Sequence, residues 1–276
     1  MEKIHFIQHG TDGLGHQLHG LFSALALHNI KHYYFDGYFF LQKKFLFEHL
    51  SEEVSSDAKN YLVEIIKKFL EYYEQKPISY KNYIHSHEIY HIPKDFNLET
   101  LYSIDNCYYF DKIPIDEKEM IKYQSNTKIV KNFFVNDRLP PSRLYKDNVV
   151  IHLRQGDAMT TGRGNVISKY NQQLMDIFPK FVSKYKNYVF YIHTDGEAKE
   201  FVNILSEEKV KFVVLSKDEH VLNVLSDFVH SKIFVAGISS LSTICTFLGN
   251  HEKIIISDDM KHSVPENVVR IKNFLK

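Results

Sequence analysis

The second half of the chain alternates short, fully apolar runs with longer stretches whose apolar residues recur at helical spacing. Apolar runs bounded by polar residues are typical of buried parallel strands, and the helical spacing is typical of amphipathic helices. The predicted strands are 149–153, 189–192, 212–215, 233–236 and 253–256, and the predicted helices are 170–185, 197–205, 220–228 and one that ends at 248. Strands that alternate with helices predict an α/β fold with a parallel, right-handed doubly wound sheet.

Three prolines and a glycine-containing segment modify this pattern. Pro179 falls inside the apolar stripe of the first predicted helix and is expected to kink or restart it. The segment 160–165 is expected to form a loop. Pro140 and Pro141 cannot continue a helix and favour a boundary between two domains, 1–140 and 141–276. The length of 276 residues also suggests two domains, at about 150 residues each.

The first half has a weaker pattern. Strands are predicted at 4–7 and 33–35, a helix begins near residue 14, and helical spacing recurs over 61–73. Between 77 and 141 the pattern is irregular, and no element is predicted there. Three histidines of this stretch, His85, His87 and His91, are read as loop residues, for which a metal site is the less favoured interpretation.

The apolar run at 149–153 stops abruptly at Arg154-Gln155-Gly156-Asp157. Arg154 is always charged and presents a planar fork of donors that suits phosphate. Gly156 lets the backbone turn tightly and lie close to a bound group. Ligands of open α/β sheets bind beyond the carboxyl ends of the strands. The stretch therefore predicts an anion site, and a phosphate in particular.

Polar residues follow two other predicted strands. Thr194 and Asp195 come after one, and Ser239 and Ser240 come after another. Because the carboxyl ends of parallel strands meet at one edge of the sheet, we expect these residues to converge with Arg154. Two interpretations stay open for each pair. Ser239 or Ser240 is either the N-cap of the next helix or a phosphate ligand, and Asp195 either caps its helix or binds a ribose or sugar hydroxyl.

A strand, a glycine-rich turn and a helix open the chain. The turn contains Asp12, Gly13, Gly15 and His16, so backbone N–H groups and the positive end of the helix would point at its occupant. The alternative is that the glycines only permit a tight turn and close helix packing. His152, inside the apolar run, is read as a buried histidine that braces Asp157 or a backbone carbonyl.

Composition narrows the function classes. Lys and Arg number 34 and Asp and Glu number 34, so no whole-chain field attracts nucleic acid. The two cysteines lack metal-type spacing and fit a reducing compartment. The first residues are too polar for a signal-peptide core, and no window approaches the ~18 apolar residues of a membrane span. We expect a cytoplasmic protein.

Four short motifs resemble those of the α1,2- and α1,6-fucosyltransferases. His152-x-Arg154-x-Gly156-Asp157 is similar to their His-x-Arg-Arg-x-Asp motif. Gly13-Leu14-Gly15-His16-Gln17-Leu18 resembles the Gly-Leu-Gly-Asn-Gln stretch with which the bacterial α1,2 enzymes begin. His193-Thr194-Asp195-Gly196 resembles their Ser/Thr-Asp-Asp motif, and Ser239-Ser240-Leu241-Ser242 their Ser-Ser-Phe-Ser motif.

The resemblance implies a GT-B glycosyltransferase built from two Rossmann-like domains, with the acceptor in the first and the nucleotide sugar in the second. Arg154 would bind the diphosphate of GDP-fucose, with Ser239 and Ser240 alongside, and Asp195 would be a donor-site or structural carboxylate. The remaining donor-binding candidates are Gly13, Gly15, His152 and Thr194. The implied acceptor is a glycan of a bacterial cell-surface polysaccharide, modified in the cytoplasm at the inner membrane face.

The reaction needs positive charge near the departing diphosphate and a base for the acceptor hydroxyl. The sequence contains no Asp-x-Asp pair, so we expect Arg154 and helix N-termini, and no metal or other cofactor, to stabilise the diphosphate. The candidate bases are Asp12, His16, His19 and Asp157, and His16 could accept a proton near neutral pH. The sequence leaves the oligomeric state open.

Departures from the family pattern leave the donor and the base open. Gln155 stands where the motif has a second arginine, His16 replaces asparagine, and Gly196 replaces the second aspartate. A transferase of the same fold that uses another nucleotide sugar is the strongest alternative. The more distant ones are a metal-dependent hydrolase that uses His9, His16 and His19, and a nucleotide- or glycan-binding protein without catalysis.

Overall fold

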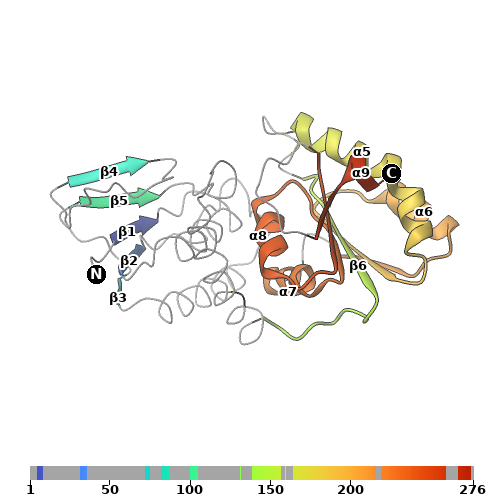
Figure 1. Cartoon of the computed structure of the whole chain (residues 1–276), viewed down its shortest axis with the longest axis horizontal. Coiled ribbons are helices and arrows are strands. Elements are labelled where there is room, and N and C mark those ends of the chain that lie inside the picture. The colour runs from blue at the N-terminus through green and yellow to red at the C-terminus, as the bar shows by residue number, and fades with distance from the viewer. Residues whose placement is uncertain are drawn as a thin grey trace. The chain divides into compact units, whose positions relative to one another are not determined.

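The chain divides into two compact units, residues 1–138 and 139–276 (Figure 1). The structure is a computed structural model. It describes residues 5–8, 32–35, 72–74, 82–86 and 100–104 of the first unit, these as backbone, together with residue 131. In the second unit it describes residues 139–156, 159, 164–215, 219–258 and 267–274.

The described strands of the first unit form one parallel sheet. They are β1 (His5–Gln8), β2 (His32–Phe35), β3 (Tyr72–Glu74), β4 (Asn82–Ser86) and β5 (Thr100–Ile104). Their order is β3-β2-β1-β5-β4, and all four pairings are parallel. The order reverses between β1 and β5, as it does in doubly wound folds. The strands predicted at 4–7 and 33–35 are confirmed, each displaced by about one residue.

Two expectations for this unit were wrong. Tyr73, placed at the end of a predicted helix, lies in β3. His85 lies in β4 and not in a loop. Strands β4 and β5 fall in the stretch where the sequence analysis placed no element. The three residues of β3 are too few to show an alternating pattern, and strand pairing then decides the conformation. The helix predicted near residue 14, together with His87 and His91, lies outside the described residues.

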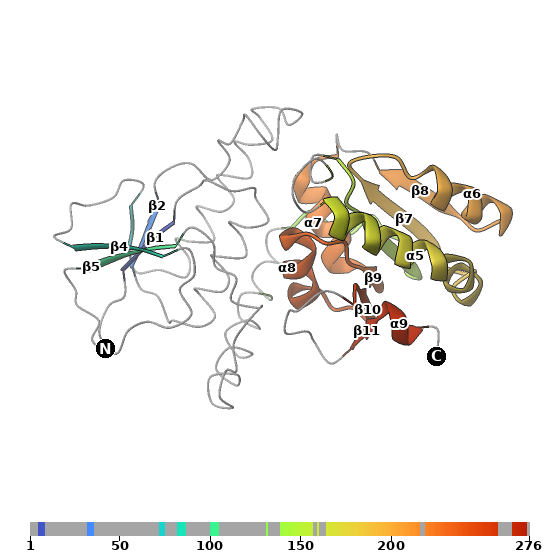
Figure 2. The same ribbon diagram turned by 90° about the horizontal axis from the view of Figure 1, so that it is seen from above.

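The second unit carries a parallel sheet with helices on both faces (Figures 1 and 2). Its elements are β6 (Asn148–Leu153), α5 (Gly164–Lys184), β7 (Val189–Thr194), α6 (Lys199–Glu207), β8 (Phe212–Leu215), α7 (Val221–His230), β9 (Ile233–Val235), α8 (Ser240–Leu248), β10 (Lys253–Ile256), β11 (Val268–Arg270) and α9 (Ile271–Phe274). The strand order is β11-β10-β9-β6-β7-β8, which is the dinucleotide-binding order, and it reverses between β6 and β9.

The five predicted strands of this unit are confirmed, and two details of the prediction were wrong. The sheet has a sixth strand, β11, which is only three residues long and followed at once by α9. Helix α5 begins at Gly164, in a segment expected to be loop, and runs without interruption through Pro179. The apolar stripe of α5 is fully buried, and this tertiary packing outweighs the hydrogen bond that Pro179 cannot donate.

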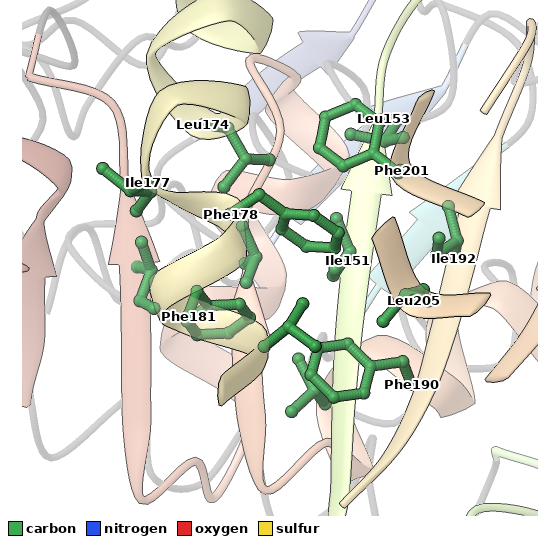
Figure 3. Close-up of a cluster of buried hydrophobic side chains, with 14 of the residues drawn as sticks. Ile151, Leu153, Leu174, Ile177, Phe178, Phe181, Phe190, Ile192, Phe201 and Leu205 are labelled. Carbon is green, nitrogen blue, oxygen red and sulfur yellow. The ribbon is translucent and has the colours of Figure 1, made fainter. Parts of the chain in front are cut away.

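One face of the sheet holds the main apolar core (Figure 3). Alternate residues of β6 and β7 point from the sheet toward α5 and α6, because successive side chains of a strand point to opposite faces. The labelled core residues are Ile151, Leu153, Leu174, Ile177, Phe178, Phe181, Phe190, Ile192, Phe201 and Leu205. Helix α9 joins this face through Ile271. The other face packs against α7 and α8, where Phe228 contacts the rings of His152, His193 and Phe234.

Candidate functional site

The candidate site lies where the strand order of the second unit reverses. Strand β6 ends at Leu153, so Arg154 begins the loop that leaves the sheet, and the neighbouring β9 ends at Val235, ahead of the N-terminus of α8. Strand β7, on the other side of β6, delivers Thr194 and Asp195 at the same edge. The fold therefore brings together the three loops that the sequence analysis expected to converge.

Asp195 holds the loop that follows β6. Its Oδ2 atom accepts a hydrogen bond from Arg154 Nη1, and its Oδ1 atom accepts one from the backbone N–H of Gln155 (2.5 Å) and one from that of Gly156 (2.9 Å). Burial raises the pKa of Asp195, but the charge of Arg154 and the two backbone donors outweigh it and keep the pKa below its ordinary value. Asp195 is therefore an ionised brace between β7 and the Arg154 loop.

The interpretation of Asp195 as a helix cap was wrong. The N-cap of α6 is Ala198, which makes no side-chain capping bond. Asp195 lies three residues earlier and turns toward Arg154 because the ion pair and two backbone donors offer more than one capping bond would. Its neighbour Thr194 accepts a hydrogen bond from the backbone N–H of Gly196 at 3.0 Å, which closes the turn after β7.

Gly237, in the loop after β9, lies against the end of β6. A Cβ atom at Gly237 would lie 2.5 Å from the backbone oxygen of His152, closer than side chains approach. Ser239 then caps α8: its Oγ atom accepts a hydrogen bond from the backbone N–H of Leu241 at 3.2 Å. Its carbonyl oxygen accepts from Thr243 Oγ1 at 3.1 Å. The predicted N-cap is confirmed for Ser239, and Ser240 is the first residue of the helix.

His152 points to the face that α7 and α8 cover. Its Nδ1 atom lies 2.5 Å from Ser242 Oγ, and its ring packs against Phe228 with the ring centroids 5.0 Å apart. Burial, reinforced by the charge of Arg154, lowers the pKa of His152 to about 3, so the ring is neutral at physiological pH. We expected a carbonyl or Asp157 as its partner, but the partner is the Ser242 hydroxyl, one helical turn after the cap. Asp157 lies outside the described residues.

Three supporting side chains were missed by the sequence analysis. Asn171 donates through Nδ2 to the Arg154 carbonyl at 3.3 Å, and the buried Tyr170 donates through its hydroxyl to the Ala236 carbonyl at 2.6 Å. Both residues come from α5, so one helix supports the loops on both sides of the switch point. Asp227, in α7, places its Oδ2 atom 3.0 Å from Nε2 of His193 in β7. The sequence offers a signal for Asn171 alone, which is a polar residue next to the apolar stripe of α5.

The other candidate residues lie outside the described parts of the chain. These are His9, Asp12, Gly13, Gly15, His16, His19 and Asp157. Within the described residues, no group of three or more His, Cys, Asp or Glu side chains is placed to hold a metal ion. Nor is any helix in those parts of the chain long and apolar enough to cross a membrane.

No protein-family model matches the chain, and no curated protein matches it by sequence. Among solved structures, POFUT1 in complex with GDP is similar at 13% identity and a TM-score of 0.52 over 98% of each chain. POFUT1 in complex with GDP-fucose aligns at 14% identity and a TM-score of 0.36 over 63% of this chain, which spans 54% of that one. The E. coli heptosyltransferase WaaC with ADP-2-deoxy-2-fluoro heptose aligns at 9% identity and a TM-score of 0.41, over 97% of this chain and 92% of its own.

The full-length likeness to POFUT1 bears on the fold. Two units, each with a parallel sheet in doubly wound order, align over nearly the whole of both chains. The chain has the α/β architecture of the GT-B glycosyltransferases, as the sequence predicted.

Proposed function

We propose that the protein is a glycosyltransferase whose second unit binds the diphosphate of a nucleotide-sugar donor. The observation that carries the proposal is the placement of Arg154. It follows the central strand at the point where the strand order reverses, it is held by the ionised Asp195, and the neighbouring loop leads into the N-terminus of α8. An oriented guanidinium beside a helix N-terminus is a favourable environment for phosphate.

The chemistry follows from this charge. Transfer of a sugar from a nucleotide releases a diphosphate, and a fixed positive group stabilises that developing charge more in the transition state than in the bound donor. Arg154 would bind the phosphate oxygens, while Asp195 fixes the plane of the guanidinium in advance. The α8 N-terminus, capped by Ser239, would add a second centre of positive charge.

For the donor we propose GDP-fucose. The resemblance of the segments at 152–157 and 239–242 to fucosyltransferase motifs supports this, and the structural neighbour POFUT1 was crystallised with GDP and with GDP-fucose. Gln155 and Gly196 depart from those motifs. Because of these departures, a different nucleotide sugar is the second candidate for the donor.

The rest of the proposal concerns the acceptor side and rests on the sequence resemblance. A glycan acceptor would bind the first unit, and the acceptor hydroxyl would lose its proton to Asp12, His16, His19 or Asp157. We propose a metal-independent, inverting reaction in the cytoplasm, with peripheral contact at the inner membrane face and a cell-surface polysaccharide as the product.

The test is a calorimetric titration of the purified protein with GDP, UDP, CMP and ADP in the presence of EDTA, followed by assays for release of the sugar from the matching donors. We expect GDP to bind and GDP-fucose to turn over. Tighter binding of another nucleotide would select the second candidate, and binding without turnover would indicate a silent binder. A protein that binds none of these nucleotides would refute the proposal.

A further inference from the structure

A chain of polar side chains runs from the buried His193 and Asp227 to the partly exposed Arg143, at the end of the sheet that carries the candidate site. His193 Nε2 lies 3.0 Å from Asp227 Oδ2, and Asp227 is only 1% exposed. Arg143 binds the same carboxylate through one edge of its guanidinium: Nε donates to Oδ1 at 3.2 Å and to Oδ2 at 3.0 Å, and Nη2 donates to Oδ2 at 2.6 Å. Arg143 Nη1 also donates to Glu219 at 3.1 Å.

Stability alone is a poor explanation for this arrangement. A buried carboxylate loses its hydration, and an ion pair repays that loss only with good geometry, so apolar residues of similar volume often serve the fold as well. The ring of Phe228, next to Asp227 in the sequence, packs against His193 with the centroids 5.1 Å apart, so the surroundings could accommodate an apolar contact. Burial raises the pKa of Asp227, but the hydrogen bonds from His193 and Arg143 outweigh it, and the group stays ionised.

The position of His193 connects this chain to the site. His193 is the last residue but one of β7, directly before Thr194 and two residues before Asp195. It is also the register partner of His152 in β6, so the two histidines lie side by side on the face covered by α7 and α8. Whatever fixes the His193 ring fixes the end of β7, and Asp195 at that end holds Arg154.

We propose that Asp227 is a positioning residue. It anchors the carboxyl end of β7 through His193 and so holds Asp195 in place to accept its hydrogen bonds from the Arg154 loop. Arg143 is its countercharge. It enters from the segment that follows Leu139, the first residue of the second unit, and Ser226 holds the same segment by donating to the Pro140 carbonyl at 2.7 Å. The effect on nucleotide binding rests on the proposed function, whereas the effect on the loop does not.

The test uses the full-length Asp227→Asn variant, which keeps the side-chain volume and removes the charge. Two quantities are measured well below the unfolding midpoint: the hydrogen exchange of the Gln155 and Gly156 amides, which donate to Asp195, and the dissociation constant for GDP. We expect exchange about tenfold faster and GDP binding about tenfold weaker. The matched control is Asp176→Asn, an exposed carboxylate on α5 that accepts from Gln172, and it should change neither quantity.

Arg143→Gln keeps the proposal testable if the Asp227 variant fails to fold, because Arg143 is 38% exposed and its loss leaves Asp227 in contact with His193. It should shift both quantities in the same direction by a smaller factor. Unchanged amide exchange, or unchanged GDP affinity in a protein that binds GDP, would overturn the proposal even if the unfolding midpoint falls. If the wild type binds no GDP, the proposed function fails and the exchange of the two amides alone decides on Asp227.

Discussion

The two faces of the six-stranded sheet carry different kinds of side chain. The face toward α5, α6 and α9 is a continuous apolar cluster, in which Phe178 and Phe181 are fully buried (Figure 3). The face toward α7 and α8 holds the half-buried His152 and the buried His193 and Asp227 among its apolar side chains. Both faces come from the same strands, because alternate residues of β6 and β7 serve each one.

The difference separates two tasks. Apart from the Tyr170 hydroxyl, the apolar cluster stabilises the fold without directional contacts, at roughly 1.5 to 3 kcal/mol for each large side chain removed from water. The hydrogen bonds of the other face are directional, and they join strand ends to α7 and α8 just below the Arg154 loop. We therefore expect substitutions on the apolar face to change stability, and substitutions on the polar face to change the site.

The largest expected effect on stability is that of Phe178→Ala. Phe178 contacts the rings of Phe181, Phe190 and Phe201, and its removal should lower the free energy of unfolding by about 3 to 5 kcal/mol. Nucleotide affinity measured below the unfolding midpoint should not change. Urea unfolding and a GDP titration check both. A large loss of affinity in the folded variant would mean that the two faces do not divide the tasks.

Gly237→Ala should have an intermediate effect and act on both quantities. The new Cβ atom would lie 2.5 Å from the His152 backbone oxygen, so the loop after β9 must move away from the end of β6, at a cost of about 1 to 3 kcal/mol. Nucleotide affinity should fall as well. The control is Gly249→Ala at the other end of α8, whose Cβ would meet the His251 ring. It should lower stability and leave affinity intact, and equal losses of affinity in both variants would count against the site.

The smallest expected effect is a pH dependence. Burial lowers the pKa of folded His152 to about 3, with Arg154, Asp195 and His193 as the charged or titratable neighbours, whereas an unfolded histidine titrates near about 6.5. Below about pH 6.5 the unfolded chain binds a proton that folded His152 does not, so the free energy of unfolding decreases as the pH falls toward about 3. The contribution of His152 to the free energy of unfolding is therefore complete only above about pH 6.5.

His152→Asn isolates this contribution, because asparagine does not titrate and can still reach Ser242. Urea unfolding at about pH 7.5 and about pH 5.5 should show a smaller loss of stability for the variant than for the wild type. Asp195 and Asp227 have lowered pKa values and stay ionised at both of these pH values, so they do not contribute to the difference between the two proteins. Equal losses in the two proteins would contradict the assignment of a neutral His152 in the folded protein.

The apolar face is also the part that the sequence predicts best. The stripe Leu174, Ile177, Phe178 and Phe181 gives α5 its buried side, and the run that ends at Leu153 gives β6. Arg154 and Asp195 are expected at one edge because both follow buried strands. Their ion pair is not, because a polar residue after a strand is equally suited to cap a helix or to bind a ligand.

The contacts on the polar face cannot be predicted from the sequence, for a different reason. His152 and Ser242 are 90 residues apart, and Arg143 and Asp227 are 84 apart, so no local spacing connects them. Each of these residues is ordinary in its own stretch of sequence, and only the order of the strands brings it to its partner. β11 is missed because three partly exposed residues carry no periodicity.

The central claim is that Arg154 at the switch point binds a nucleoside diphosphate, and calorimetric titration of GDP into the wild type and Arg154→Ala tests it most directly. Lys232→Gln is the control, since Lys232 precedes β9 and pairs with Asp147 just before β6, at the opposite edge of the sheet. Arg154→Ala should fold and bind GDP about tenfold to a hundredfold more weakly, the loss of one charge-assisted hydrogen bond, while the control binds like the wild type. Equal affinity for GDP in all three proteins would contradict the claim.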